Sequence, residues 1–159
     1  MIQVDVKSMA LFFFFAFLDE KRAIEAASES VEFYRKKISK NPQLKSTVAL
    51  VSVTKQIWEK QSGHFVRGRP NYSPESGWLL PAGIDMGPWK EFQKLAQEDE
   101  FICLIWSRIL KISDEDISLG LGVSVGTLRY RIGRALRKLG GISNPVSTKS
   151  SPGLNVVPT

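Results

Sequence analysis

Two helix starts and one helix stop follow one another between Ile112 and Leu139. Ser113 precedes three consecutive carboxylates, and a capping side chain followed by acidic residues in the first turn is typical of a helix start. Gly122 comes at the end of this short segment and is the residue best suited to end a helix in a left-handed conformation. Ser124 then predicts the cap of a second helix. The pattern therefore predicts a helix-turn-helix whose first helix is about two turns long.

The second helix of this pattern has an apolar face and a basic face. The apolar positions recur at helical spacing: Leu128, Ile132, Ala135 and Leu139. The charged residues of the segment are all cations: Arg129, Arg131, Arg134, Arg137 and Lys138. A helix that uses charge only for solubility usually carries both cations and carboxylates, whereas a face of cations alone suits DNA phosphates. The alternative is a basic, solvated last helix of a bundle, because cations also stabilise a helix C-terminus.

Candidate DNA-binding side chains occupy the cap, the N-terminal turns and the basic face of this helix. Thr127, Arg129 and Tyr130 stand where a recognition helix touches base edges. Tyr130 and Arg131 belong to the predicted interface, and the sequence leaves open whether each contacts a base or a phosphate. The full candidate set is Ser124, Thr127, Arg129, Tyr130, Arg131, Arg134, Arg137 and Lys138.

This stretch resembles the fourth region of bacterial sigma factors. Its residues that match the family pattern are Ser113, Glu115, Asp116, Ile117, Ser118, Leu121, Gly122, Val123, Ser124, Gly126, Thr127, Leu128, Arg129, Arg131, Arg134, Ala135, Lys138 and Leu139. The sequence departs from the pattern at Leu119 and Gly120. Since glycine inside a helix costs about 1 kcal/mol relative to alanine, we expect the first helix to be weakened or closely packed against a neighbour. The resemblance implies binding to the -35 promoter element in the major groove, beside RNA polymerase.

A run of apolar residues, Met9 to Leu18, is too short to span a bilayer, which takes about 20 residues. A secretory signal is the alternative, but Asp5 lies in the leader and no A-x-A site closes the run. The sequence predicts instead a helix that starts near Ser8 and is buried on most sides.

Two more helices are predicted before residue 62. The first runs from Asp19, its cap, to Lys40, and Asn41-Pro42 ends it. Its apolar positions are Ile24, Ala27, Val31, Tyr34 and Ile38. The second covers Leu44 to Trp58. A strand over Thr47 to Val53 is the alternative there, because that stretch is rich in residues that favour strands.

The run FLDEKRAIEAASESVEF resembles the second region of small extracytoplasmic-function sigma factors, which binds the polymerase clamp. The matching positions are Asp19, Ala23, Glu25, Ala26 and Glu29, with Ser28 and Val31 replacing a glutamine and an aromatic residue. The resemblance implies polymerase contacts by Asp19, Glu25 and Glu29. The family's next helix reads and melts the -10 element, for which the candidates here are Lys55, Trp58 and Lys60. A packing or dimerisation helix is the alternative.

Glycines and prolines interrupt any period between Gln61 and Pro88, which predicts a linker. We expect its apolar group Trp78-Leu79-Leu80 to pack on a helical domain or a partner. Its basic and aromatic residues suit single-stranded DNA or a phosphate backbone, with a solvated loop as the alternative; they are Phe65, Arg67, Arg69 and Tyr72. His64 is the only histidine and lacks the companions of a metal site, so we expect a surface residue.

Pro88 suits the first turn of a helix, and the spacing to Lys111 predicts one or two helices with a break at Gln97 to Asp99. Cys103 lies in an apolar run and is predicted to be a core residue. After Leu139, Gly140-Gly141 is predicted to stop the last helix, ahead of a disordered tail.

The sequence thus predicts an all-α protein with a helical domain at 1–61, a linker at 62–88, a helix-turn-helix domain at 89–140 and a tail at 141–159. The net charge of +6 suits nucleic acid, and a single cysteine fits a reducing, cytoplasmic compartment. No catalytic motif, cofactor site or membrane segment is recognised. The predicted function is that of a sigma-factor-like protein with promoter DNA and core RNA polymerase as partners. The alternative is a stand-alone regulator whose amino-terminal helices dimerise or bind a regulatory protein or signal.

Overall fold

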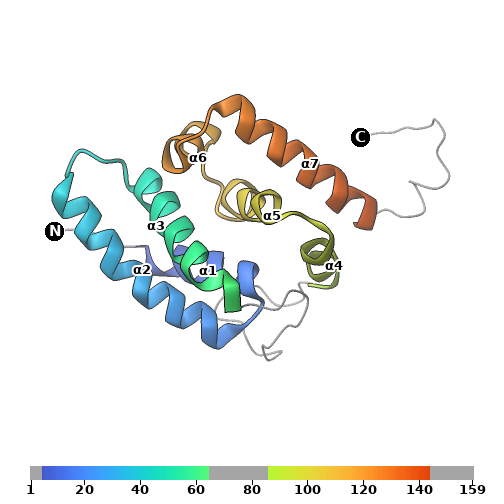
Figure 1. Cartoon of the computed structure of the whole chain (residues 1–159), viewed down its shortest axis with the longest axis horizontal. Coiled ribbons are helices and arrows are strands. Elements are labelled where there is room, and N and C mark those ends of the chain that lie inside the picture. The colour runs from blue at the N-terminus through green and yellow to red at the C-terminus, as the bar shows by residue number, and fades with distance from the viewer. Residues whose placement is uncertain (1–4, 65–85, 144–159) are drawn as a thin grey trace.

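The computed structural model describes residues 5–64 and 86–143, and every regular element within them is a helix (Figure 1). The elements are α1 (Val6–Phe17), α2 (Glu20–Lys40), α3 (Ser46–Gln61), the 3-10 turn η1 (Ser62–His64), α4 (Gly87–Leu95), α5 (Glu98–Leu104), the π-helical turn η2 (Ile105–Ile109), α6 (Asp114–Leu121) and α7 (Val125–Ser143). The all-α prediction is confirmed, and Thr47 to Val53 is helical rather than a strand. The predictions for Phe65 to Tyr72, for Trp78-Leu79-Leu80 and for the tail after Ser143 lie outside the described residues.

α1 is the predicted buried helix, and most of its side chains are inaccessible. Asp5 caps it by accepting a hydrogen bond from the Ser8 N–H at 2.9 Å. Its phenylalanine rings meet tryptophans from three other elements. The ring pairs are Phe12 with Trp106, Phe15 with Trp89 and Phe17 with Trp58, with centroids 5.1, 5.4 and 5.2 Å apart. Across the two described ranges, none of the helices has the length and apolarity needed to cross a membrane.

α2 begins and ends where the sequence predicts, with Asp19 as its cap and Asn41 after its last turn. Its buried face differs from the prediction at one position, because Ile24 is 45% exposed. The buried positions are Ala23, Ala26, Ala27, Ser30 and Tyr34. The buried stripe of α2 therefore excludes Ile24. Its small alanine side chains allow α1 to approach closely.

Both halves of the chain contribute to one continuous cluster of buried side chains. Hydrogen bonds cross it as well, since the Trp89 indole N–H donates to the Phe15 carbonyl at 2.8 Å and the Gln93 amide donates to the Ala16 carbonyl at 2.6 Å. α4 has Pro88 in its first turn. The predicted break is present but falls at Ala96 and Gln97 rather than at Gln97 to Asp99, because Glu98 already begins α5. Cys103 is fully buried, as predicted. The domain boundaries near residues 61 and 88 stay a prediction.

The predicted stop at Gly140-Gly141 is wrong, because α7 continues to Ser143. Among the glycines of the described ranges, the positive φ that ends a helix occurs at Gly122. Leu139 and Ile142 on either side of the glycine pair pack against the core. This packing offsets the weak helix propensity of the two glycines.

Candidate nucleic-acid interface

The predicted helix pair with its turn is present in α6 and α7. Ser113 Oγ accepts a hydrogen bond from the Asp116 N–H at 3.2 Å and so caps α6. Gly122 ends α6 in the left-handed region with φ of 73°. Ser124 Oγ accepts from the Thr127 N–H at 3.0 Å, which caps α7. These three local signals fix the geometry of the pair, as the sequence predicts.

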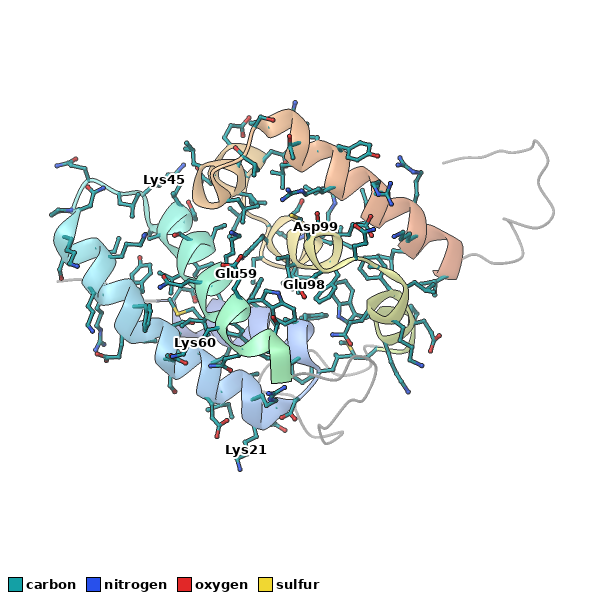
Figure 2. All side chains as sticks on the ribbon, viewed as in Figure 1. Lys21, Lys45, Glu59, Lys60, Glu98 and Asp99 are labelled. Carbon is teal, nitrogen blue, oxygen red and sulfur yellow. The ribbon has the colours of Figure 1, made fainter. Side chains whose placement is uncertain are left out.

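α3 supports α6 through a close backbone approach and a buried carboxylate. Gly120 faces Val51 without room for a side chain, so of the two expectations for this glycine, close packing is confirmed. Asp116 is buried and accepts from the Thr47 hydroxyl at 2.6 Å. Lys45, which is labelled at the start of α3 in Figure 2, has its Nζ 3.1 Å from Asp116 Oδ2. The Thr47 hydrogen bond is the main reason that the pKa of Asp116 lies below its ordinary value. α6 is therefore held by the first turns of α3.

The predicted apolar stripe of α7 is confirmed, with Leu128, Ile132 and Ala135 buried against the core. α7 lies alongside α4 and α5 (Figure 1). This packing leaves Thr127, Arg129 and Tyr130 exposed at the N-terminal end of the helix, and Tyr130 is 62% exposed.

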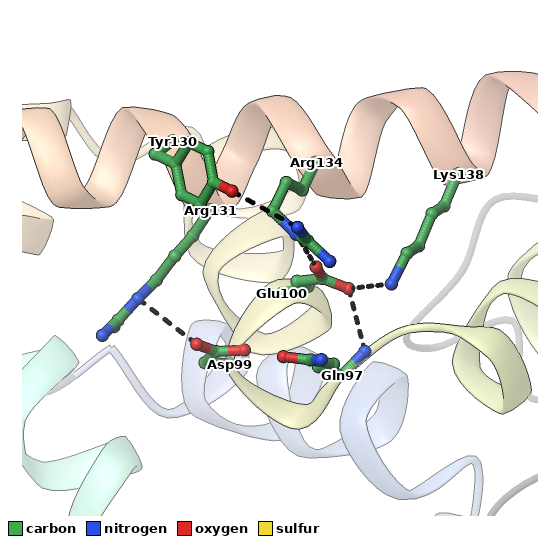
Figure 3. A network of polar contacts seen from close by, with 7 residues as sticks. All are labelled: Gln97, Asp99, Glu100, Tyr130, Arg131, Arg134 and Lys138. Carbon is green, nitrogen blue, oxygen red and sulfur yellow. Dashed lines mark hydrogen bonds and ion pairs between the residues drawn. The ribbon is translucent and has the colours of Figure 1, made fainter.

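The basic face of α7 has carboxylate partners, which come from α5 (Figure 3). Asp99 Oδ2 lies 3.3 Å from Arg131 Nε. Glu100 accepts from both Arg134 Nε and Lys138 Nζ, each at 2.6 Å. Three of the candidate DNA-binding cations are thus engaged by carboxylates of α5. The acidic run Glu98 to Glu100 was the only sequence signal for these pairs, and helix capping explained it equally well.

Glu100 is the anchor of this contact, because its side chain is only 2% exposed. Burial acts to raise its pKa. Hydrogen bonds from Arg134, Lys138 and the Gln97 N–H outweigh burial and lower the pKa of Glu100 to about 2. The carboxylate therefore stays ionised at neutral pH and holds α7 on α5. Tyr130 joins the network, since its hydroxyl accepts from Arg134 Nη1 at 3.3 Å.

The remaining two cations of α7 are more accessible. Arg129 reaches back across the turn, where its Nε donates to Asp114 Oδ2 at 3.0 Å. Arg137 is exposed and forms no ion pair with a residue of the described ranges. The accessible members of the candidate set are accordingly Ser124, Thr127, Arg129, Tyr130 and Arg137.

The candidate polymerase contacts lie on α2 and at its start. Asp19 accepts from the Arg22 N–H at 3.0 Å as a helix cap. Glu25 is exposed on α2, whereas Glu29 accepts hydrogen bonds from Lys60 and from the Gln61 amide, the latter at 2.8 Å. Glu25 is therefore the member of this set whose carboxylate is presented to solvent.

The candidates for melting DNA all have partners within the chain, but only Trp58 is buried, and Lys60 is 61% exposed. Trp58 is buried in the core, and its indole N–H donates to Glu98 Oε1 at 3.0 Å. Lys55 pairs with Glu59 at 3.2 Å, and Lys60 binds Glu29. Within the described ranges, no cluster of three or more histidine, cysteine or acidic side chains forms a metal site.

The sequence matches no protein-family model and no curated protein. Its fold is similar to that of the sigma factor RpoE crystallised in complex with the anti-sigma factor NepR from Bartonella quintana. The TM-score is 0.69 at 14% identity, over 87% of this chain and 91% of that one. The chain has a sigma-factor-like fold.

Proposed function

We propose that the protein is a sigma-factor-like transcription protein rather than an enzyme, and that α6 and α7 form a helix-turn-helix that binds promoter DNA. The observation that carries this proposal is the capped turn, which presents Thr127, Arg129 and Tyr130 to solvent. Side chains at the N-terminal end of a recognition helix contact base edges, while cations farther along contact phosphates. Arg137 suits the second role.

RNA polymerase core is the proposed protein partner of the amino-terminal helices. The exposed carboxylate of Glu25 supports this assignment. Asp19 caps α2 and Glu29 bonds α2 to α3, so these two carboxylates have roles within the chain. The neighbouring sigma factor was crystallised with an anti-sigma factor. A regulatory protein is therefore a further proposed partner of this chain.

The decisive experiment is gel filtration of the full-length chain with bacterial core RNA polymerase at moderate salt. We expect co-elution, and we expect Glu25→Lys to weaken it. Glu32→Lys is the matched control, because Glu32 is also exposed on α2 and belongs to none of the proposed contacts. Full-length chain that never co-elutes with the polymerase would contradict the polymerase part of the proposal.

One observation favours a second candidate, a stand-alone regulator that binds DNA without melting it. The three candidate melting residues, Lys55, Trp58 and Lys60, all have partners inside the chain. This candidate predicts a DNA complex that forms without polymerase. It also predicts that the bases of bound DNA stay paired, which permanganate reactivity of the thymines would measure.

A further inference from the structure

Arg129 is the accessible cation of α7 closest to the turn, and Asp114 at the start of α6 forms a hydrogen bond with it. Its Nε donates to Asp114 Oδ2 at 3.0 Å, and its Nη2 lies 4.0 Å from Glu115 Oε2. Asp114 opens α6, so this contact joins the two helices across the turn. The Arg129 side chain nevertheless remains 62% exposed.

The pair occupies only part of the guanidinium group. The hydrogen bond uses the Nε–H, and the N–H groups of Nη1 and Nη2 form no hydrogen bond with any residue of the described ranges. A guanidinium edge of this kind donates two parallel hydrogen bonds to O6 and N7 of guanine in the major groove. Arg129 can therefore keep its contact with Asp114 while it reads a base.

An Arg129 side chain that is ordered before DNA binds favours discrimination between base sequences over affinity for all DNA. A free arginine loses rotamer freedom when it docks, and a side chain that is already ordered avoids much of that cost. Two nearby carboxylates also offset the charge that would attract any phosphate.

The ion pairs of the other cations of α7 differ from the Arg129 pair in burial. Arg134 and Lys138 bind Glu100, which is buried, and thereby fasten α7 to α5. Asp114 is 32% exposed and binds an arginine at the exposed end of α7. The first pairing holds the helix, whereas the second orients one side chain on it.

We propose that Asp114 is a positioning residue for DNA recognition, which orients Arg129 toward a guanine and so sets sequence preference at one base pair. This inference rests on the proposed function, because it requires that α7 bind DNA.

The test is selection from a pool of random-sequence DNA duplexes by the full-length chain, with and without core RNA polymerase. For Asp114→Asn we expect a loss of roughly tenfold in preference at one base pair, as expected for one arginine–guanine contact. Binding to unselected DNA should be unchanged or tighter. Arg129→Ala should lose the same preference, and adding Asp114→Asn to it should change nothing further.

Glu115→Gln is the matched control, because it removes the same charge from the same turn of α6 but its carboxylate is farther from Arg129. Asp114→Glu keeps both charge and helix start while displacing the carboxylate, so a loss of preference there does not come from an unfolded α6. Equal losses in Asp114→Asn and Glu115→Gln, or an unchanged preferred sequence in Asp114→Asn, would overturn the inference alone. If the unaltered chain enriches no sequence in either arm, the proposed DNA-binding function fails, and the inference fails with it.

Discussion

Gly120 of α6 lies so close to Val51 of α3 that a Cβ at residue 120 would be 2.7 Å from both Cβ and Cγ1 of the valine. The Val48 carbonyl oxygen would lie 3.0 Å from the same atom. The glycine that departs from the sigma-factor pattern is therefore a point of close backbone approach between α3 and α6, beside the Asp116 contacts.

Gly120→Ala should destabilise the protein by about 1 to 3 kcal/mol, because the added methyl group meets a Cβ and a backbone atom that cannot rotate away. The measurement is urea unfolding followed by circular dichroism. Gly133→Ala is the control, since its nearest neighbour is the flexible end of Arg137 at 3.6 Å. It should be neutral or stabilising by up to about 1 kcal/mol, as alanine favours helix. Equal stability of the two variants would contradict the close approach.

Glu100→Gln should lower the free energy of unfolding by about 3 kcal/mol, because it leaves Arg134 and Lys138 without their shared carboxylate. Asp99→Asn provides the comparison. Asp99 pairs with Arg131 in the same network but is 45% exposed, so its loss should cost less than about 1 kcal/mol. Chemical unfolding of both variants at pH 7 compares the two losses of unfolding free energy. Similar losses would contradict the role of Glu100 as the anchor of α7.

The same carboxylate predicts a pH dependence of stability. The pKa of Glu100 falls from an ordinary 4.5 to about 2 on folding, so the unfolded chain takes up its proton first as the pH drops. Its stabilising contribution is therefore complete above about pH 5 and is lost between about pH 5 and pH 2, by about 3 kcal/mol in total. Unfolding measured across this range should show a shallower acid loss for Glu100→Gln than for the unaltered chain. Parallel curves would argue against an ionised Glu100.

Arg137→Ala should weaken binding to all DNA sequences alike and reduce the slope of log affinity against log salt by about 0.9, the loss of one phosphate contact. Stability should not change. Arg35→Ala is the matched control, because it removes an exposed arginine from α2, which is not part of the proposed interface. Lys138→Ala should behave differently from both and destabilise the fold, since Lys138 binds Glu100. Fluorescence anisotropy at several salt concentrations measures the slopes, and equal slopes for Arg137→Ala and Arg35→Ala would remove Arg137 from the interface.

Cys103 should react with thiol reagents only when the protein opens. Burial raises the pKa of its thiol to about 11, so the reactive thiolate is scarce at pH 8 and is shielded by the core. We expect slow labelling by a disulfide reagent in buffer and complete labelling in denaturant. Gly120→Ala should label faster in buffer, in proportion to its lower stability. Rapid labelling of the unaltered chain would contradict the buried position.

Local signals predicted most of the helices, whereas the partners of α7 could not be read from the sequence. Asp19, Ser113, Ser124 and Gly122 act within one turn of their own backbone, so their residue types and spacing suffice. The Glu100 pairs join residues more than 30 positions apart. Such contacts depend on how α5 and α7 pack. A basic helix has the same sequence pattern whether its cations face DNA or a neighbouring carboxylate. Tertiary packing likewise decided the exposure of Ile24 and the continuation of α7 past Gly140.

The aromatic contacts of α1 also have a consequence for biosynthesis. Phe15 leaves the ribosome well before Trp89, its partner 74 residues later in the chain. At roughly 5 to 20 residues per second, that interval is about 4 to 15 seconds. Until α4 and η2 emerge, the phenylalanine run of α1 lacks two of the elements that pack against it in the folded protein. The nascent chain therefore offers a hydrophobic segment that chaperones bind, and truncated products that end before α4 should be substrates for proteolysis.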